Sequence, residues 1–430
     1  MKKKLLILGV GLAAIMAIGI PLLSSCATTA PEPTPTPEPT PEPTPTPEPT
    51  TEPIKVGCPI PLTGYMASDG QNMYEAKILA MEDINAAGGI LGRPIELIFF
   101  DSKELLAETF AAAAEKLINQ DHVDAVIASY SGESGPATFR QYDQPYIYGE
   151  PSRACIRLYT DARDTAGNIH LGAANGVIYG EKIWQAIKDL TEANGYELPN
   201  NRLTVVTGPW EWSFDHGEGI TLAAEADGWE VAEPIVVALE TREWAGVQAG
   251  IREFDPAIIF MEAYDTGCVA SFTQQLNTDP INAIIAHSQI ALAPAYIDLM
   301  GEEANGVMGL SICDIQYGDP AGEDYATRYE ARWGRPAPKS ESAKAYDFVH
   351  IWKAAVERVG DVSDYAAINQ AINEYPYTGL GGTYVFNEDH FCPDFPPHIL
   401  QVQGGEWVEL WYGGELVPEA GTWQVPPWID

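Results

Sequence analysis

Short apolar runs alternate with longer amphipathic segments along most of this chain, and no other feature restricts its possible folds as strongly. The run 54–60 is apolar throughout most of its length. A helix face follows, marked by apolar residues at three- and four-residue spacing and ending at a Gly-Gly pair: Met73, Ala76, Ala80 and Ile84. Apolar runs without strict alternation are typical of parallel strands that are covered on both faces. The alternation therefore predicts an α/β fold built from parallel βαβ units.

The same two patterns continue in two series. The first predicts strands at 95–100, 123–128 and 146–148 and a helix at 106–118. After a helix at 177–190, the second predicts strands at 203–207, 235–237, 257–260 and 281–286 and helices at 217–226 and 244–254. A late helix at 343–359 precedes β-like runs at 383–386, 398–402 and 407–411. Two series predict two lobes, and residues 54–430 also exceed the usual size of one hydrophobic core.

The N-terminus has the layout of a bacterial export signal, because three lysines precede the apolar run 5–23. A run of this length could also cross a bilayer, since about 20 apolar residues suffice. However, Gly19 and Pro21 interrupt it, and Leu23-Ser24-Ser25-Cys26 resembles the lipobox of bacterial lipoproteins. We therefore expect a signal peptide at 1–25 and lipid attachment at Cys26. The folded part would be exported and held at the membrane only through the lipid.

Residues 26–53 are predicted to form a linker. From Ala30 to Pro53, proline alternates with threonine and glutamate, and no large apolar residue occurs. Such a segment buries nothing that would offset the entropy lost on ordering. We expect a stiff polyproline-type spacer that rises about 3.1 Å per residue.

The chain is strongly acidic, with 61 acidic and 24 basic residues and a formal net charge of −37. Removal of the signal peptide would take away three lysines and leave 21 − 61 = −40. This charge argues against a nucleic-acid partner, because phosphate binding needs a basic surface.

Five cysteines follow Cys26, and none forms a Cys-x-x-Cys pair: Cys58, Cys155, Cys268, Cys313 and Cys392. Their odd number leaves the disulfide pattern open. No metal-site spacing is present, and we expect neither a metal nor another cofactor. Cys58, inside the first predicted strand, is expected to be a buried small hydrophobe.

Several segments resemble the type I periplasmic binding proteins of ABC importers, particularly the branched-chain amino-acid and amide group. The opening carries most of the resemblance, in segments 54–57, 61–64 and 80–93, which are IKVG, PLTG and AMEDINAAGGILGR. Further similar segments are 131–137, His216-Gly217-Glu218-Gly219, Gly306-Val307 and Ala345-Tyr346-Asp347. The resemblance spans nearly all of residues 54–420.

This resemblance implies two Rossmann-like lobes joined by a three-strand hinge and closing on a ligand. The first lobe would hold 54–172 plus 315–382, and the second 173–314 plus 383–430. The implied function is capture of a small polar ligand, such as an amino acid, an amide or a small carboxylate, and its delivery to the permease and ATPase subunits of an ABC importer. We expect a monomer without catalytic residues.

The resemblance places the ligand between the lobes, outside the carboxyl ends of the strands. The loop after the third strand would bind a ligand carboxylate through Ser131, with Tyr130 and Ser134 beside it. A helix starting at Gly135 or Pro136 would add its positive end. A helix-cap or turn role is the alternative for Ser131.

After the fourth strand, Ser152 is the hydroxyl candidate, and Glu150 stands where the family often has a small residue. Glu150 would either bind a cationic group or pair with Arg153. In addition, Asp69 stands where members of the family carry an aromatic residue, in the loop after the first strand.

In the second lobe, His216 would stack on the ligand or hydrogen-bond to it, or else be a solvated histidine at a helix start. Trp210 and Trp212 would wall the pocket or pack within the lobe. Tyr264 and Asp265 lie at the end of another predicted strand and are further candidate ligand contacts. The segment 286–289, which ends at Gln289, has no carboxylate where amino-acid binders carry an acid for the ammonium. Asp69, Glu150 or Asp265 would supply that charge, or the ligand would lack an amine.

Two rival functions stay open. The same fold also serves ligand-sensing domains, so fold alone does not decide between transport and signalling. A secreted carbohydrate-active enzyme needs only two suitably spaced carboxylates, and an acidic chain has many carboxylates. No Gly-x-Ser-x-Gly elbow, zinc signature or Walker loop supports another enzyme class.

Overall fold

The computed structural model describes residues 52–103, 105–161, 166–263, 265–312, 314–316, 318–339, 341–418 and 421–429. The predicted signal peptide, Cys26, Tyr264 and nearly all of the predicted linker therefore lie outside the described residues. Among the helices that the structure describes, none has both the length and the hydropathy of a membrane span.

Five parallel strands form the first sheet, in the order β2-β1-β3-β4-β5. They are β1 (Ile54–Ile60), β2 (Ile95–Asp101), β3 (Ala125–Ile127), β4 (Tyr146–Tyr148) and β5 (Ile169–Leu171). The pairing of Ile54 with Ile95 sets the register of the first two strands. The parallel order confirms the prediction of βαβ units. β5 was not predicted, because His170 interrupts its short apolar run.

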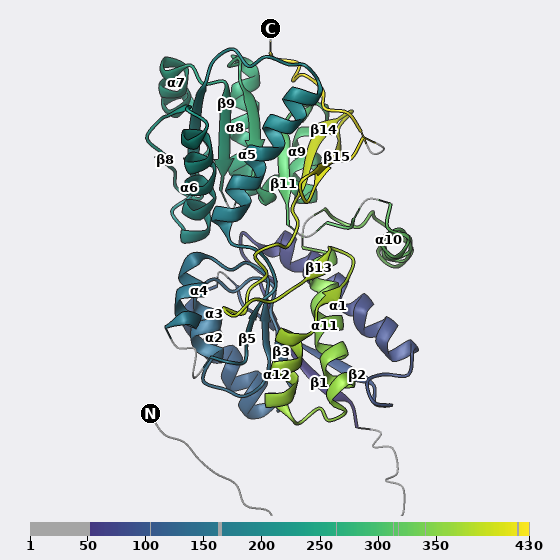
Figure 1. Cartoon of the computed structure of the whole chain (residues 1–430). Helices are drawn as coiled ribbons and strands as arrows, with labels where there is room; N and C mark the ends of the chain where they lie inside the picture. Colours follow the sequence, from purple (N-terminus) through teal and green to yellow (C-terminus); the bar gives the residue numbers. More distant parts are fainter. Residues whose placement is uncertain are drawn as a thin grey trace, which may run out of the picture. The chain divides into compact units, whose positions relative to one another are not determined.

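Helices cover both faces of this sheet (Figure 1). On one face, Val56 and Cys58 pack with Met73 of α1 (Ala67–Ala86) and with α11 (Ala343–Val359). On the other, α2 (Ala107–Ala114), the π-helix η1 (Glu115–Gln120) and α3 (Ser134–Phe139) surround Val126 and Tyr146. Cys58 is fully buried, as expected, and is a free thiol like Cys155, Cys268 and Cys392.

The second sheet has nine strands, with a parallel centre and an antiparallel edge. The parallel strands are β6 (Arg202–Thr207), β7 (Glu230–Val231), β8 (Ile235–Val236), β9 (Ile258–Glu262), β10 (Ile284–His287) and β11 (Met308–Ser311). The last three strands pair antiparallel beside β11, and are β14 (His398–Gln403), β15 (Glu406–Tyr412) and β16 (Glu415–Leu416). The chain therefore returns to this sheet after the helical region between Pro320 and Glu374.

Five helices and two 3₁₀ turns accompany the second sheet (Figure 1). Residues of α5 (Gly176–Ala193) and α6 (Glu211–Ala226) pack against one face, and residues of α7 (Ala245–Phe254), α8 (Thr266–Thr278) and α9 (Pro294–Met300) against the other. The 3₁₀ turns are η2 (Gln289–Leu292) and η3 (Gly301–Ala304).

The start of α6 differs from the prediction. The helix begins at Glu211, whereas the expected start was residue 217. Its interior contains Gly217 and Gly219, although glycines usually disfavour a helix interior. Here they allow two helices to approach closely. A Cβ atom at Gly219 would lie 2.0 Å from the Val177 carbonyl oxygen, and one at Gly180 would lie 2.3 Å from that of His216. His216 is therefore in the second turn of α6.

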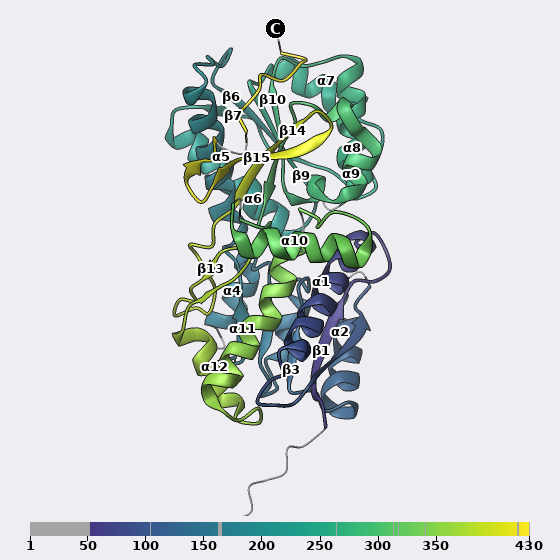
Figure 2. The same cartoon turned by 90° about the vertical axis from the view of Figure 1, so that its right-hand side faces the viewer.

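Apart from α4 (Arg153–Thr160), which follows β4, the remaining elements lie between β11 and β14 in the chain. They are α10 (Pro320–Trp333), α12 (Tyr365–Glu374), β12 (Tyr377–Thr378) and β13 (Thr383–Tyr384). Figure 2 shows α10 beside one end of α1. Arg328 of α10 is 2.6 Å from Asp83 of α1, and Arg335 is 2.7 Å from Glu75. These ion pairs attach α10 to α1.

Candidate functional site

Carboxyl ends of strands from the two sheets meet at a buried polar contact. Glu150 follows β4 of the first sheet, and Gln289 follows β10 of the second. The Gln289 amide Nε2 donates a hydrogen bond to the Glu150 carboxylate and lies 3.5 Å from the Tyr130 hydroxyl. These three side chains are at most 5 % exposed. The contact joins segments 139 residues apart and lies where open α/β sheets bind ligands.

The backbone around Glu150 is fixed by its own strands. The Gly149 N–H donates to the Ser129 carbonyl at 3.1 Å, and the Tyr148 hydroxyl donates to the Glu150 carbonyl. Glycine is required at 149, because a Cβ atom there would lie 2.8 Å from Cε of Lys344. The backbone at Glu150 is therefore held at the strand end by bonds within the protein.

Five buried ionisable residues form what we call the charged cluster: Asp69, Lys77, Glu150, Glu341 and Lys344. Lys344 Nζ is 3.0 Å from the Glu341 carboxylate and donates to the Gly149 carbonyl at 3.1 Å. The Tyr130 hydroxyl donates to Asp69 at 3.2 Å. The cluster thus connects α1 and α11 to the loops that follow β3 and β4.

Burial shifts the pKa of two members of the charged cluster in the direction that favours their uncharged forms. The pKa of Glu150 is raised well above its usual value, first by burial and then by the neighbouring Glu341 carboxylate, while Lys344 opposes the shift. The pKa of Lys77 is lowered to about 8, again chiefly by burial. Burying charges is costly unless they are paired. A cluster of this kind is therefore a candidate for function.

Several polar atoms around the contact have no hydrogen-bond partner among the described residues. They are Ser129 Oγ, Ser288 Oγ, Gln289 Oε1 and Lys77 Nζ, all buried. Such groups normally find a partner, since an unsatisfied buried polar atom costs roughly 1–3 kcal/mol. Ser129, Ser288 and Gln289 follow strand ends, so a polar ligand bound there would supply partners.

A second polar contact joins α4 (Arg153–Thr160) to α6, and we call it the latch. The backbone N–H and Nε of Arg153 bond to Asp215 at 2.7 and 2.6 Å, and its terminal nitrogens bond to Glu218. Asp215 is fully buried. The sequence had offered a pair between Arg153 and Glu150. That interpretation is wrong, because the guanidinium faces these two acids of α6.

Two candidate residues cap helices. The Ser152 hydroxyl accepts from the Cys155 N–H at 3.2 Å at the start of α4 and donates to Glu133 at 2.7 Å. Asp265 accepts from the Cys268 N–H at 2.6 Å at the start of α8, and it also pairs with Arg242 at 2.5 Å. Both side chains are therefore engaged by the protein, which weakens their candidacy as ligand contacts.

The loop after β3 holds Ser131 and Ser134. Ser131 is fully buried, and its hydroxyl is 3.4 Å from the Gly132 carbonyl. The following helix α3 begins at Ser134, one or two residues before the expected start at Gly135 or Pro136, and has six residues. A Cβ atom at Gly135 would lie 2.5 Å from Ser131 Oγ, so glycine is needed there. Ser131 thus lies directly after Tyr130, beside the charged cluster.

His216 packs inside the second lobe. It is fully buried, its Nδ1 is 3.1 Å from the Trp212 carbonyl, and its ring stacks on Tyr179 at 6.1 Å. The alternative of a solvated histidine at a helix start is therefore wrong. Burial lowers the pKa of His216 to about 4, so the ring is neutral at pH 7. Trp212 is buried against this ring at 4.7 Å, while Trp210 is partly exposed before α6.

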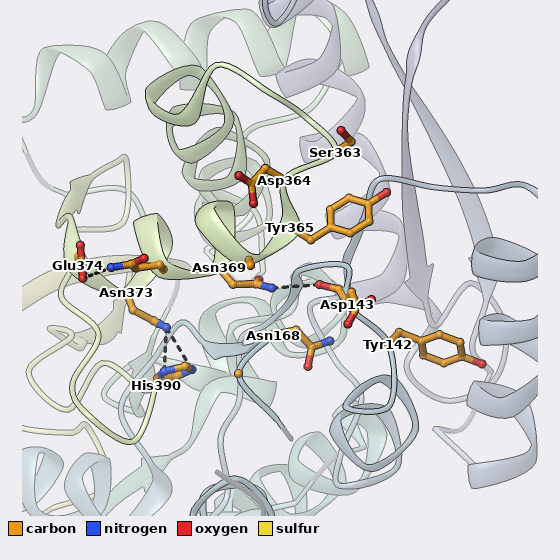
Figure 3. Close-up of a pocket in the computed structure, with 13 residues that line it drawn as sticks. Tyr142, Asp143, Asn168, Ser363, Asp364, Tyr365, Asn369, Asn373, Glu374 and His390 are labelled. Carbon is orange, nitrogen blue, oxygen red and sulfur yellow. Dashed lines mark hydrogen bonds between the residues drawn. The ribbon is translucent and has the colours of Figure 1, made fainter. Parts of the chain in front are cut away.

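A cavity of about 910 Å³ lies elsewhere, at the amino ends of β4 and β5 (Figure 3). Its walls include Asp143, Asn168, Asn369, Asn373 and His390. The Asn369 amide donates to the Asp143 carbonyl at 3.0 Å, and Asn373 bonds to the His390 ring. Figure 3 shows these two interactions as dashed lines. The contact between the sheets is the stronger candidate, because it lies at the carboxyl ends of strands from both sheets, where open α/β sheets bind ligands.

Lys77, Glu341 and Lys344 were missed at the sequence level. Lys77 is four residues after Met73, so it lies on the apolar face that predicted α1. A lysine on that face was a detectable signal of a buried charge. Lys344 lies between two alanines at the start of α11 and gave a similar signal. Glu341 precedes that helix, and nothing in the sequence indicated its burial.

A model of the periplasmic binding protein family matches residues 53–406. This chain belongs to the periplasmic binding protein family. The match covers the first sheet, the second sheet as far as β14, and the segments that carry Glu150 and Gln289.

Solved structures similar to this periplasmic binding protein have the same fold. A proposed branched-chain amino acid ABC transporter protein from Silicibacter pomeroyi is 25% identical, with a TM-score of 0.78 over 88% of this chain and 100% of that one. LivJ from Streptococcus pneumoniae, solved with isoleucine, is 17% identical, with a TM-score of 0.71 over 83% and 98% of the two chains. A solute binding protein from R. palustris, solved with benzoate, is 18% identical, with a TM-score of 0.71 over 86% and 99%.

An amino acid binding protein from Pseudomonas aeruginosa is 34% identical to this periplasmic binding protein over 94 residues. That match covers 22% of this chain and 25% of the relative, so the chain matches only about a quarter of the relative's length.

Proposed function

We propose that this protein is an exported solute-binding lipoprotein that captures a small polar ligand between two lobes and delivers it to the permease and ATPase of an ABC importer. The ligand would be an amino acid, an amide or a small carboxylate. The lobes would comprise residues 54–172 plus 315–382 and residues 173–314 plus 383–430. The protein would release the ligand unchanged.

The observation that carries this proposal is the contact between Glu150 and Gln289. It brings side chains from both sheets together in a buried setting, with partnerless polar atoms beside it. A ligand that bridges the two loops stabilises the closed form only by its greater affinity for that form. Membership in the periplasmic binding protein family supports the same interpretation.

A thermal-shift screen of the purified protein against amino acids, amides and small carboxylates tests the proposal. A true ligand at a hundredfold excess over its Kd should stabilise the fold by about 2.7 kcal/mol and raise Tm. Mass spectrometry after incubation should recover the ligand intact. The absence of any shift across all three classes, or conversion of the compound, would contradict the proposal.

The lipid anchor rests on the sequence 23–26, which lies outside the described residues. Labelling with radioactive palmitate in a bacterial host tests it. The wild type should carry label, and Cys26→Ser should carry none. An unlabelled wild type would contradict lipid attachment at Cys26.

A further inference from the structure

The cavity of about 910 Å³ lies at the opposite end of the first sheet from Glu150. Asp143 precedes β4 and Asn168 precedes β5, whereas Glu150 follows β4. Because β4 and β5 are parallel, their amino ends lie at one edge of the sheet and their carboxyl ends at the other. The remaining walls come chiefly from α12 and from His390. The cavity is therefore separate from the contact between Glu150 and Gln289.

Acidic side chains give the cavity a negative charge. No lysine or arginine occurs among the described residues that line it, whereas three exposed carboxylates do: Asp143, Asp364 and Glu374. Two of these acids accept hydrogen bonds from uncharged donors only. Asp364 accepts from the Ala367 N–H at 3.1 Å, and Glu374 accepts from the Gln370 amide at 2.7 Å. The carboxylates therefore repel an anionic ligand and attract a cationic one.

The amide side chains of the lining already donate to groups of the protein. Asn369 Nδ2 donates to the Asp143 carbonyl at 3.0 Å. Asn373 Nδ2 lies 2.8 Å from His390 Nε2, and Figure 3 shows both contacts as dashed lines. Gln370 donates to a carboxylate, as described above. The lining therefore offers a ligand mainly hydrogen-bond acceptors.

Asn168 adds an independent observation in the same cavity. Its side chain is 4 % exposed and lines the cavity, between Asp143 and His390 in the view of Figure 3. Its Nδ2 atom donates to the carbonyls of Phe139 and Gln144 at 3.0 and 2.9 Å, which fixes the orientation of the amide. Its Oδ1 atom has no hydrogen-bond partner among the described residues. Such an acceptor normally has a donor, and here a ligand would supply it.

We infer that this cavity binds a linear polyamine, a flexible chain whose ammonium groups are separated by methylene segments. Ammonium groups are donors without acceptors, so they match a lining of carboxylates and an amide oxygen. The rings of Tyr142 and Tyr365 also line the cavity, and aromatic rings attract cations. This inference goes beyond the proposed function and does not depend on it, because the residues involved lie outside the contact between the lobes.

Calorimetry with spermidine as the probe tests the inference. The matched control probe is 1,8-octanediol, which has a similar length and no charge. Spermidine should bind to the wild type at one site, and 1,8-octanediol should not bind at the same concentration. Added salt should weaken spermidine binding, because it screens exposed charges.

Two double variants of equal net charge separate a site from general attraction to an acidic chain. Asp143→Asn with Glu374→Gln keeps the side-chain sizes and should weaken spermidine binding by about fivefold or more, because two ion pairs are lost. Glu96→Gln with Glu253→Gln removes two exposed carboxylates from β2 and α7 and should leave the affinity unchanged.

Hydrogen–deuterium exchange of the wild type locates the bound probe and requires no variant. Spermidine should slow exchange in residues 363–374 and leave residues 286–289 unchanged. Equal loss of affinity in the two double variants, equal binding of 1,8-octanediol, or protection of 286–289 without protection of 363–374 would each overturn the inference. None of these results would contradict the proposed function, which the thermal-shift screen tests separately.

Discussion

Glu262 has a buried carboxyl group at the carboxyl end of β9. Its side chain is fully buried and accepts a hydrogen bond from the Ser213 hydroxyl, while Oε1 has no partner among the described residues. Burial raises its pKa from about 4.5 to about 8. The folded protein therefore keeps a proton on Glu262 at a pH where the unfolded chain has already lost it.

The sign of the resulting pH dependence follows from this difference. Between pH 4.5 and 8 the folded state holds more protons than the unfolded state, so the contribution of Glu262 to stability is full below pH 4.5 and is lost as the pH rises to 8. Glu262→Gln removes this loss. Between pH 5 and 8, the variant should gain on the order of 3 kcal/mol in unfolding free energy relative to the wild type.

Urea unfolding at several pH values measures this gain. Glu225→Gln, an exposed site on α6, should follow the wild-type curve. Parallel pH curves for the wild type and Glu262→Gln would show that Glu262 is ionised in the fold and that its burial has been misjudged.

At the residue scale, sequence reasoning identified Glu150, Tyr130, Asp69 and Gln289, which the structure brings together. The resemblance to the binding-protein family made them candidates, and Tyr130, Glu150 and Gln289 also follow strand ends. Asp265 and Ser152 satisfied the same criterion but cap helices, because the residue after a strand is often also the start of a helix. Sequence position alone does not separate these two uses.

At the element scale, the latch between α4 and α6 should favour the closed form. Arg153 is partly exposed, but its partner Asp215 is fully buried, and burial raises the pKa of Asp215 even though Arg153 opposes the shift. If Arg153 is removed, a buried acid loses its cation whenever the lobes are together. The open form would then be favoured, and the apparent ligand affinity would fall.

Arg153→Ala should therefore weaken binding of the best compound from the thermal-shift screen by about tenfold. Arg157→Ala is the matched control, since its pair with Glu211 is exposed and such pairs contribute little. Calorimetry compares the two variants with the wild type. If both variants bind as tightly as the wild type, the latch does not stabilise the closed form.

Some elements were predicted with their observed bounds, and others were missed for identifiable reasons. The strand 54–60 and the helix 343–359 were predicted correctly, because each has an uninterrupted pattern. α10 and α12 were missed although they begin with clear caps, Asp319 before Pro320 and Asp364 before Tyr365. β5 has three residues and no such signal.

At the scale of the whole molecule, the pairing of distant segments was beyond sequence patterns. Glu150 and Gln289 are 139 residues apart, and no periodicity relates them. The return of β14 to the second sheet beside β11 is similarly non-local. The resemblance to a family predicted how distant segments combine into lobes, whereas local sequence patterns predicted only the individual helices and strands.

The central claim is that a small molecule is held between the lobes at the contact of Glu150 with Gln289. Small-angle X-ray scattering, with and without the best compound from the thermal-shift screen, tests it most directly. The account predicts a smaller radius of gyration with the compound, and no such change for Gln289→Ala at the same concentration. An unchanged radius in wild-type protein that calorimetry shows to be saturated would contradict it.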